Sequence, residues 1–144
     1  MADIEVRHCL VCEDIRQEIL GKISINGLFG IAPDVRINLK EINKSVADLI
    51  IGFYVSGKAG VHQSTFTLKL PSKEVLVELP LADFTIPENS DSKMLLGVEL
   101  SGIVLPVEGD YEIQLSDGNG ELYFTTPLKI GVADSALFES KSPS

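Results

Sequence analysis

The sequence predicts an all-β protein, an antiparallel β-sandwich of about eight strands. Apolar and polar residues alternate along most of the chain with a period of two, which is typical of strands buried on one face. Clusters of Gly, Pro, Asn, Asp and Ser separate these segments, as in proteins built from many short strands. The 144 residues suit one domain. We expect residues 1–132 to form it and residues 133–144 to be a flexible C-terminal tail.

The first two expected strands are residues 4–12 and 22–29. Residues 4–12 are mostly apolar, which indicates a central or covered strand. In the second strand, the alternation predicts that Ile23 and Ile25 face the core. Between the two strands, residues 14–20 are compatible with one helical turn that is capped by its first residue.

Four further strands are expected in the middle of the chain, at residues 47–55, 64–70, 75–79 and 93–101. The first of these is apolar on both faces, so we expect it to be covered on both sides. Before it, residues 39–48 are compatible with a second short helical turn. The polar residues 89–93 predict an exposed loop.

The last two expected strands, residues 110–116 and 122–130, form a hairpin. The sequence Asp-Gly-Asn-Gly between them favours a tight turn that uses Gly118 and Gly120. Pro127 has no amide hydrogen to donate, which predicts an edge position or a bulge in the second strand.

The start of this hairpin carries a further indication of the fold. Tyr111 follows Gly109 where the strand begins, and Ile113 lies two residues later. Immunoglobulin-like sandwiches place a tyrosine at such a corner, with its hydroxyl bonded to the backbone and a buried residue two positions on. We therefore expect an immunoglobulin-like sandwich, in which Tyr111, Gly109, Gly118 and Gly120 have structural roles.

The acidic composition disfavours some classes of partner. Twelve Lys and Arg face 21 Asp and Glu, for a net charge of -9. Nucleic acids and anionic membranes are bound through clusters of basic residues, and the sequence has no such cluster, so we expect neither as a partner. The first residues do not resemble a signal peptide, and no stretch approaches the roughly 20 apolar residues of a membrane helix. We expect reduced cysteines and a cytoplasmic protein.

The most distinctive polar segment contains Glu13, Asp14, Arg16 and Glu18. If this segment is an interaction corner, its carboxylates would bind a cation, or its guanidinium would bind an acidic group. As a structural corner, Arg16 would pair with a carboxylate and hold a turn between two strands. Because exposed charges are mostly solvated, the structural interpretation is favoured. Within the functional interpretation, protein recognition is favoured over catalysis.

Two cysteines and two histidines are the remaining candidates for chemistry. His8, Cys9, Cys12 and His62 are a formally possible zinc set. Strand alternation, however, places Cys9 and Cys12 on opposite faces, so we expect core thiols rather than a metal site or a disulfide. His62, at the start of a strand, is expected to order a turn.

Asp117, Asn119 and Glu121 place oxygen ligands at alternate positions, as in half of a calcium loop. The glycine and the closing carboxylate that an EF-hand loop requires are missing, so a tight hairpin is the simpler account. We expect no catalytic residue, cofactor or metal in this protein.

An ordered set of short motifs spans nearly the whole chain. The motifs are Cys12-Glu13-Asp14-x-Arg16-x-Glu18 followed by GKISINGLF, then Gly60-x-His62, Phe84-x-x-Pro87 and Leu105-Pro106-x-x-Gly109-x-Tyr111. In this order they resemble a family of bacterial proteins known as a domain of unknown function. The resemblance implies a small immunoglobulin-like sandwich, and it implies no enzyme activity, cofactor or substrate.

These observations favour a non-catalytic cytoplasmic module for protein interaction or structure. Its partner would be another protein, or a second copy of the chain paired through an exposed edge strand. The alternative is a module that binds a sugar or a cation at the Glu13, Asp14, Arg16 and Glu18 corner or at the 117–121 loop. A third hypothesis is a hydrolase whose site assembles across strands around His62.

Overall fold

The computed structural model describes residues 4–18, 20, 22–88 and 94–132, which form eleven β-strands and no α-helix. The strands are β1 (Ile4–Gln17), β2 (Ile23–Ile31), β3 (Asp34–Leu39), β4 (Ile50–Gly57), β5 (Gly60–His62), β6 (Ser64–Lys69), β7 (Val75–Pro80), β8 (Phe84–Ile86), β9 (Met94–Glu99), β10 (Gly109–Asp117) and β11 (Leu122–Val132). The all-β class is confirmed, but the number of strands was underestimated. The eight predicted strands are present, and β3, β5 and β8 are additional. The predicted loop at 89–93 and tail at 133–144 lie outside the described residues.

Nine strands form one large open sheet in the order β7-β6-β10-β11-β3-β2-β1-β4-β9. All neighbours are antiparallel except β3 and β11, which run parallel. The short strands β5 and β8 form a separate two-stranded sheet. The sheet is not closed, since β7 and β9 each have a neighbour on one side only.

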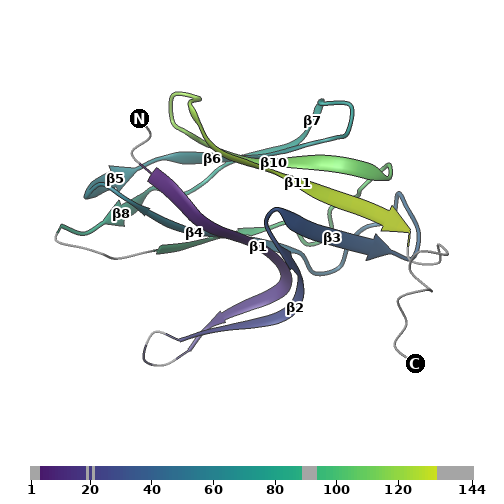
Figure 1. Ribbon diagram of the computed structural model, residues 1–144, viewed down its shortest axis with the longest axis horizontal. Helices are drawn as coiled ribbons and strands as arrows, with labels where there is room; N and C mark the ends of the chain where they lie inside the picture. The colour runs from purple at the N-terminus through teal and green to yellow at the C-terminus, as the bar shows by residue number, and fades with distance from the viewer. Residues whose placement is uncertain (1–3, 19, 21, 89–93, 133–144) are drawn as a thin grey trace.

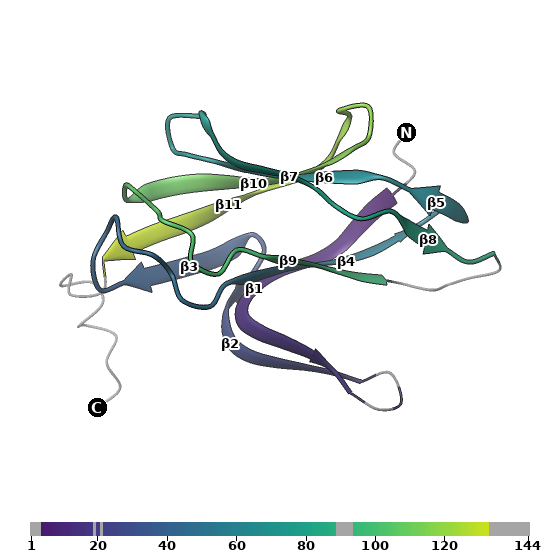
Figure 2. The ribbon, with the colours of Figure 1, turned by 180° about the vertical axis from the view of Figure 1, so that it is seen from behind.

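The large sheet folds over, so that its two halves lie one above the other (Figures 1 and 2). The upper half in Figures 1 and 2 holds β7, β6, β10, β11 and β3, and the lower half holds β2, β1, β4 and β9. The halves meet at β2 and β3, which share only two residue pairs, Gly30 with Val35 and Ile31 with Asp34. This short pairing lets the sheet change direction without losing its continuity.

The core lies between the two halves and is built from the inward positions of both. Phe53 on β4 is fully buried and contacts Phe66 on β6 and Phe124 on β11, with ring centroids 6.2 Å apart in each case. These aromatic contacts join the lower half to the upper half. The remaining fully buried side chains are mostly Ile, Leu and Val from the central strands, as alternation predicts.

Residues 14–17 and 40–49 do not form the predicted helical turns, although Leu20 lies in a 3-10 turn. Residues 14–17 continue β1, because their backbone pairs with residues 23–26 of β2. Residues 40–49 form turns and bends that bond to a distant segment: the Asn43 amide donates to the Leu105 carbonyl at 2.9 Å, and the Val46 amide to the Ile103 carbonyl at 2.8 Å. In both places a neighbouring segment satisfies backbone groups that a helical turn would have left to bonds within the turn.

The hairpin of β10 and β11 agrees with its sequence. Tyr111 is buried, and its hydroxyl donates to the Val107 carbonyl at 2.7 Å, as the corner predicts. The turn follows β10, and Gly120 has a φ of 88°, a left-handed conformation that glycine adopts readily. Pro127 lies before Lys129, where pairing of β11 with β3 begins, so this part of β11 has β10 as its only strand neighbour.

The end of the β1–β2 hairpin departs from its prediction. Pairing of β1 with β4 ends at Cys12, so the hairpin projects past β4 and curves away from the upper half (Figure 1). Ile23 and Ile25 were expected to face the core, and this was wrong: they are 41% and 42% exposed. No core lies opposite this end of the hairpin, so its apolar side chains cover the outer face of the lower half instead.

Candidate functional site

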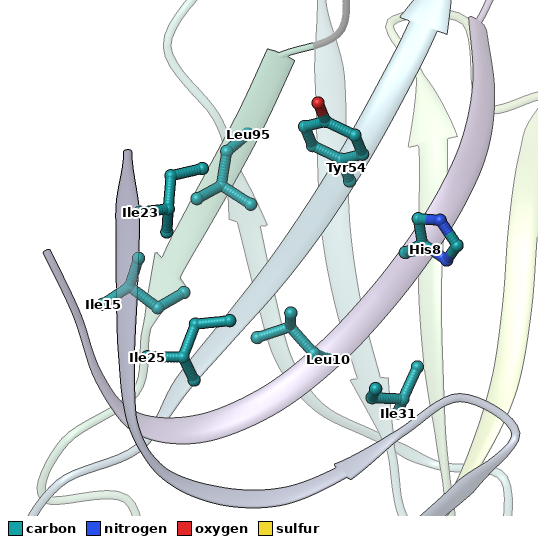
Figure 3. Close-up of a pocket in the computed structure, with 8 residues that line it drawn as sticks. All are labelled: His8, Leu10, Ile15, Ile23, Ile25, Ile31, Tyr54 and Leu95. Atoms are coloured by element: carbon teal, nitrogen blue, oxygen red, sulfur yellow. The ribbon is translucent and has the colours of Figure 1, made fainter. Parts of the chain in front are cut away.

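An apolar groove of about 320 Å³ lies on the outer face of the lower half (Figure 3). Its lining comes from all four strands of this half: His8, Leu10, Ile15, Ile23, Ile25, Ile31, Tyr54 and Leu95. Apart from one histidine and one tyrosine, the lining is entirely Ile and Leu. We call these eight residues the apolar groove.

The curvature of the β1–β2 hairpin creates the groove. Register places Ile15 opposite Ile25 and Leu10 opposite Ile31, so that four aliphatic side chains share one concave face. On the neighbouring strand β4, Gly52 lies opposite Leu10 and has no side chain to fill the space. A Cβ there would lie 3.0 Å from the Ile15 side chain and 3.4 Å from Leu10. The hollow therefore depends on both the hairpin and this glycine.

One end of the groove carries its polar groups. His8 and Tyr54 are directly paired across β1 and β4, and their rings stack with centroids 6.2 Å apart. Figure 3 shows the Tyr54 hydroxyl pointing away from the isoleucines. An imidazole and a phenol at the edge of an aliphatic surface are able to form hydrogen bonds with a ligand whose apolar part lies deeper.

A second pocket of about 220 Å³ continues the apolar groove across the sheet. It is lined by Ile15, Ile50, Leu95, Gly97 and Glu99, and it shares Ile15 and Leu95 with the groove. We call it the Glu99 pocket. Glu99 ends β9 and is exposed to solvent.

The predicted interaction corner is not assembled into a site. Asp14 and Arg16 form an exposed ion pair at 3.0 Å on β1, which is the pairing that the structural interpretation expected. Glu13 lies against Gly27 instead, and the Glu18 amide donates to the Lys22 carbonyl at 2.7 Å within the hairpin. The four charged residues therefore belong to the rim of the projecting hairpin.

The two cysteines are buried and are not joined to each other. Burial raises the pKa of Cys9 to about 12, and burial is also the main reason that the pKa of Cys12 is raised. Their expected role as core thiols is confirmed. Pairing of β1 with β4 is regular from Cys9 to Cys12, so the two side chains lie on opposite faces of β1, and both are buried. Both thiols stay protonated at neutral pH, which makes them poor nucleophiles.

His62 orders a turn, as expected. It is buried in β5, its Nε2 donates to the Lys58 carbonyl at 2.7 Å, and its ring stacks on Phe84 with centroids 5.6 Å apart. This nitrogen is already used, so the hydrolase hypothesis would have to rely on the other one. Among the described residues, no group of three or more His, Cys, Asp or Glu side chains is arranged to hold a metal ion.

A polar cleft of about 290 Å³ lies where the turn after β10 meets the end of β5. Its lining is mostly polar: Val61, His62, Gln63, Asp117, Gly118, Asn119 and Tyr123. Asp117 Oδ1 accepts the amides of Asn119 and Glu121 at 2.8 Å each, so the tight-turn interpretation of this loop is correct. Glu121 does not line the cleft.

The apolar groove was missed at the level of sequence. The signal that pointed to it was the apolar second face of residues 47–55, which was interpreted as covered. In the structure the outward Ile50 and Tyr54 are half-buried and line the two pockets.

No family model and no curated protein matches this chain. Within the described residues, no helix is long and apolar enough to cross a membrane.

Proposed function

We propose that this protein is a non-catalytic interaction module that binds a partner protein in the apolar groove. The observation that carries the proposal is a solvent-open hollow lined almost entirely by Ile and Leu. Exposed apolar patches of this kind on otherwise polar surfaces are typical of interaction sites. A volume near 300 Å³ is enough to receive a few apolar side chains of a partner.

The expected driving force is burial of the exposed isoleucines. Ile23, Ile25 and Ile31 are each 41–50% exposed. Completing the burial of such a side chain is worth about 1 kcal/mol. Together with Leu10 and Leu95, they form a contiguous surface large enough to anchor a few partner side chains, while His8 and Tyr54 orient them.

Ile25→Asp is expected to abolish partner binding, because it places a carboxylate in the middle of the apolar surface. The measurement is co-purification from cells that naturally make the protein, with tagged wild type and variant compared by quantitative mass spectrometry. We expect recovery of the partner to fall at least about tenfold. Leu122→Asp is the matched control, since Leu122 is 47% exposed but lies outside the groove.

Equal recovery with Ile25→Asp and wild type would refute the groove as the binding surface. An interaction function would be refuted altogether by two results together: the wild type retains no protein above the level of an untagged control, and it elutes as a monomer in gel filtration. Thermal melts of both variants establish that they are folded.

A second candidate function, binding of a small sugar, is favoured by the polar cleft. It combines an aromatic ring, Tyr123, with the amide side chains of Gln63 and Asn119, which is a common chemistry for hydroxyl-rich ligands. A ligand present at a hundred times its Kd adds about 2.7 kcal/mol to stability. We expect a neutral mono- or disaccharide from a panel to raise the melting temperature of wild type, and Gln63→Ala to remove that rise. Melting temperatures that stay constant across the panel would exclude this function.

We further propose that the fold is immunoglobulin-like, that the chain belongs to the bacterial family it resembles, and that it acts in the cytoplasm. The Tyr111 corner and the folded-over sheet support the first of these proposals. The edge strands β7 and β9 are the alternative surfaces for pairing with a second copy.

A further inference from the structure

We propose that the segment bound in the apolar groove carries a Lys or Arg that pairs with Glu99. This inference rests on the proposed function and specifies its partner: a short stretch of aliphatic residues with one basic residue at the end that reaches β9. It depends on the continuity of the two pockets, on the charges that line them, and on what burial would cost Glu99.

The apolar groove and the Glu99 pocket form one continuous surface. Ile15 and Leu95 line both, so the two pockets adjoin along these side chains, and an extended segment can reach from one to the other. The His8 and Tyr54 rings mark one end of this surface, and Glu99 marks the other. Glu99 is the only Asp, Glu, Lys or Arg among the residues that line either pocket.

Two other carboxylates of the same half are paired with cations. Glu5 lies 3.5 Å from Arg7, and Asp14 lies 3.0 Å from Arg16. Among the described residues, no Lys, Arg or His pairs with Glu99 in this way. Its carboxylate is exposed to solvent.

An apolar partner that covered Glu99 would remove its hydration. A carboxylate that loses its hydration without gaining a cation or hydrogen-bond donors is strongly disfavoured, whereas a Lys or Arg at the right position compensates the loss. A fully apolar segment would therefore bind poorly over Glu99. The carboxylate selects among apolar segments for those that carry a positive charge.

The same charges disfavour a second copy as the occupant. Each copy has a net charge of -9, so a dimer through this face would bring two strongly acidic chains together. A basic partner gains from the same field, which also speeds its association.

The test is a selection from a random dodecapeptide library displayed on phage, carried out in parallel on wild type, Ile25→Asp and Glu99→Lys. We expect wild type to enrich peptides with at least two aliphatic residues and a Lys or Arg. Binding of an enriched peptide, synthesised with a fluorescent label, is measured by anisotropy. Glu99→Lys is expected to weaken this binding at least about tenfold and to enrich peptides with Asp or Glu instead.

Glu78→Lys is the matched control, because Glu78 is an exposed carboxylate on β7, the opposite edge strand. This substitution changes the net charge by the same amount as Glu99→Lys. If Glu78→Lys weakens binding as much as Glu99→Lys, the loss of binding comes from the change in net charge, and the inference is wrong. If Ile25→Asp abolishes binding while Glu99→Lys does not change it, the groove binds proteins but the role of Glu99 is refuted. If neither variant changes binding, the proposed function fails as well. A wild-type dimer that Ile25→Asp converts to monomer would make a second copy the occupant and overturn the inference.

Discussion

Phe53→Ala is expected to lower the free energy of unfolding by about 3–5 kcal/mol, the usual cost of removing a buried phenyl ring. Phe53 is fully buried on β4 and contacts Phe66 and Phe124 in the opposite half of the sheet. Its removal leaves a cavity at the contact that joins the two halves. Because single domains are stable by about 5–15 kcal/mol, this change brings the protein close to unfolding.

Urea denaturation followed by circular dichroism measures the effect, and Phe53→Leu serves as the control. Leucine keeps the site apolar and retains much of the volume, so its cost should be clearly smaller than that of alanine. A loss below 1 kcal/mol for Phe53→Ala would mean that the two halves do not depend on this contact.

Gly30→Ala is expected to cost about 3 kcal/mol, at the upper end of the range for overpacking. A Cβ at this position would lie 2.3 Å from the Asp34 carbonyl oxygen and 2.9 Å from the Val35 Cα. These are backbone atoms of the strand that joins the upper half of the sheet, so they cannot move away like the end of a flexible side chain. The clash would act directly on the two-residue pairing between β2 and β3.

Gly97→Ala is the control for this prediction, since a Cβ on Gly97 would meet no atom within 4 Å. We expect its stability to stay near that of wild type or to rise slightly, because alanine restricts the unfolded chain more than glycine does. Both variants are compared by thermal and urea denaturation. Equal stabilities for Gly30→Ala and Gly97→Ala would show that β3 can shift away from β2 at no cost.

Features that depend on neighbouring residues could be predicted from the sequence. Alternation identified eight of the strands, and the inward positions of β10 are fully buried as expected, with Ile113 and Leu115 as examples. The roles of Tyr111 and Gly120 followed from local backbone geometry, because a corner and a tight turn need only a few consecutive residues. His62 was correctly expected to bond a nearby turn.

Features that depend on pairing between segments could not be predicted from the sequence. The strands β5 and β8 have three residues each, too few for a periodic signal, and each exists because the other lies beside it. Residues 14–17 looked compatible with a helical turn until their partners in β2 were known. The charge of Glu13, Asp14, Arg16 and Glu18 made them a candidate interaction corner, but in the structure they lie along the rim of the hairpin and do not form one site.

By itself, the sequence determined the approximate positions of eight of the eleven strands, where the tight turn lies, and that the protein is acidic. Only the tertiary structure decided that the β1–β2 hairpin projects past β4 and curves, and that Ile25, Leu95 and Tyr54 share one hollow. The physical reason is that a strand's own period separates two faces but does not say which face the rest of the chain will cover. The order and register of the strands determine which face is covered, and these are set by burial summed over the whole molecule.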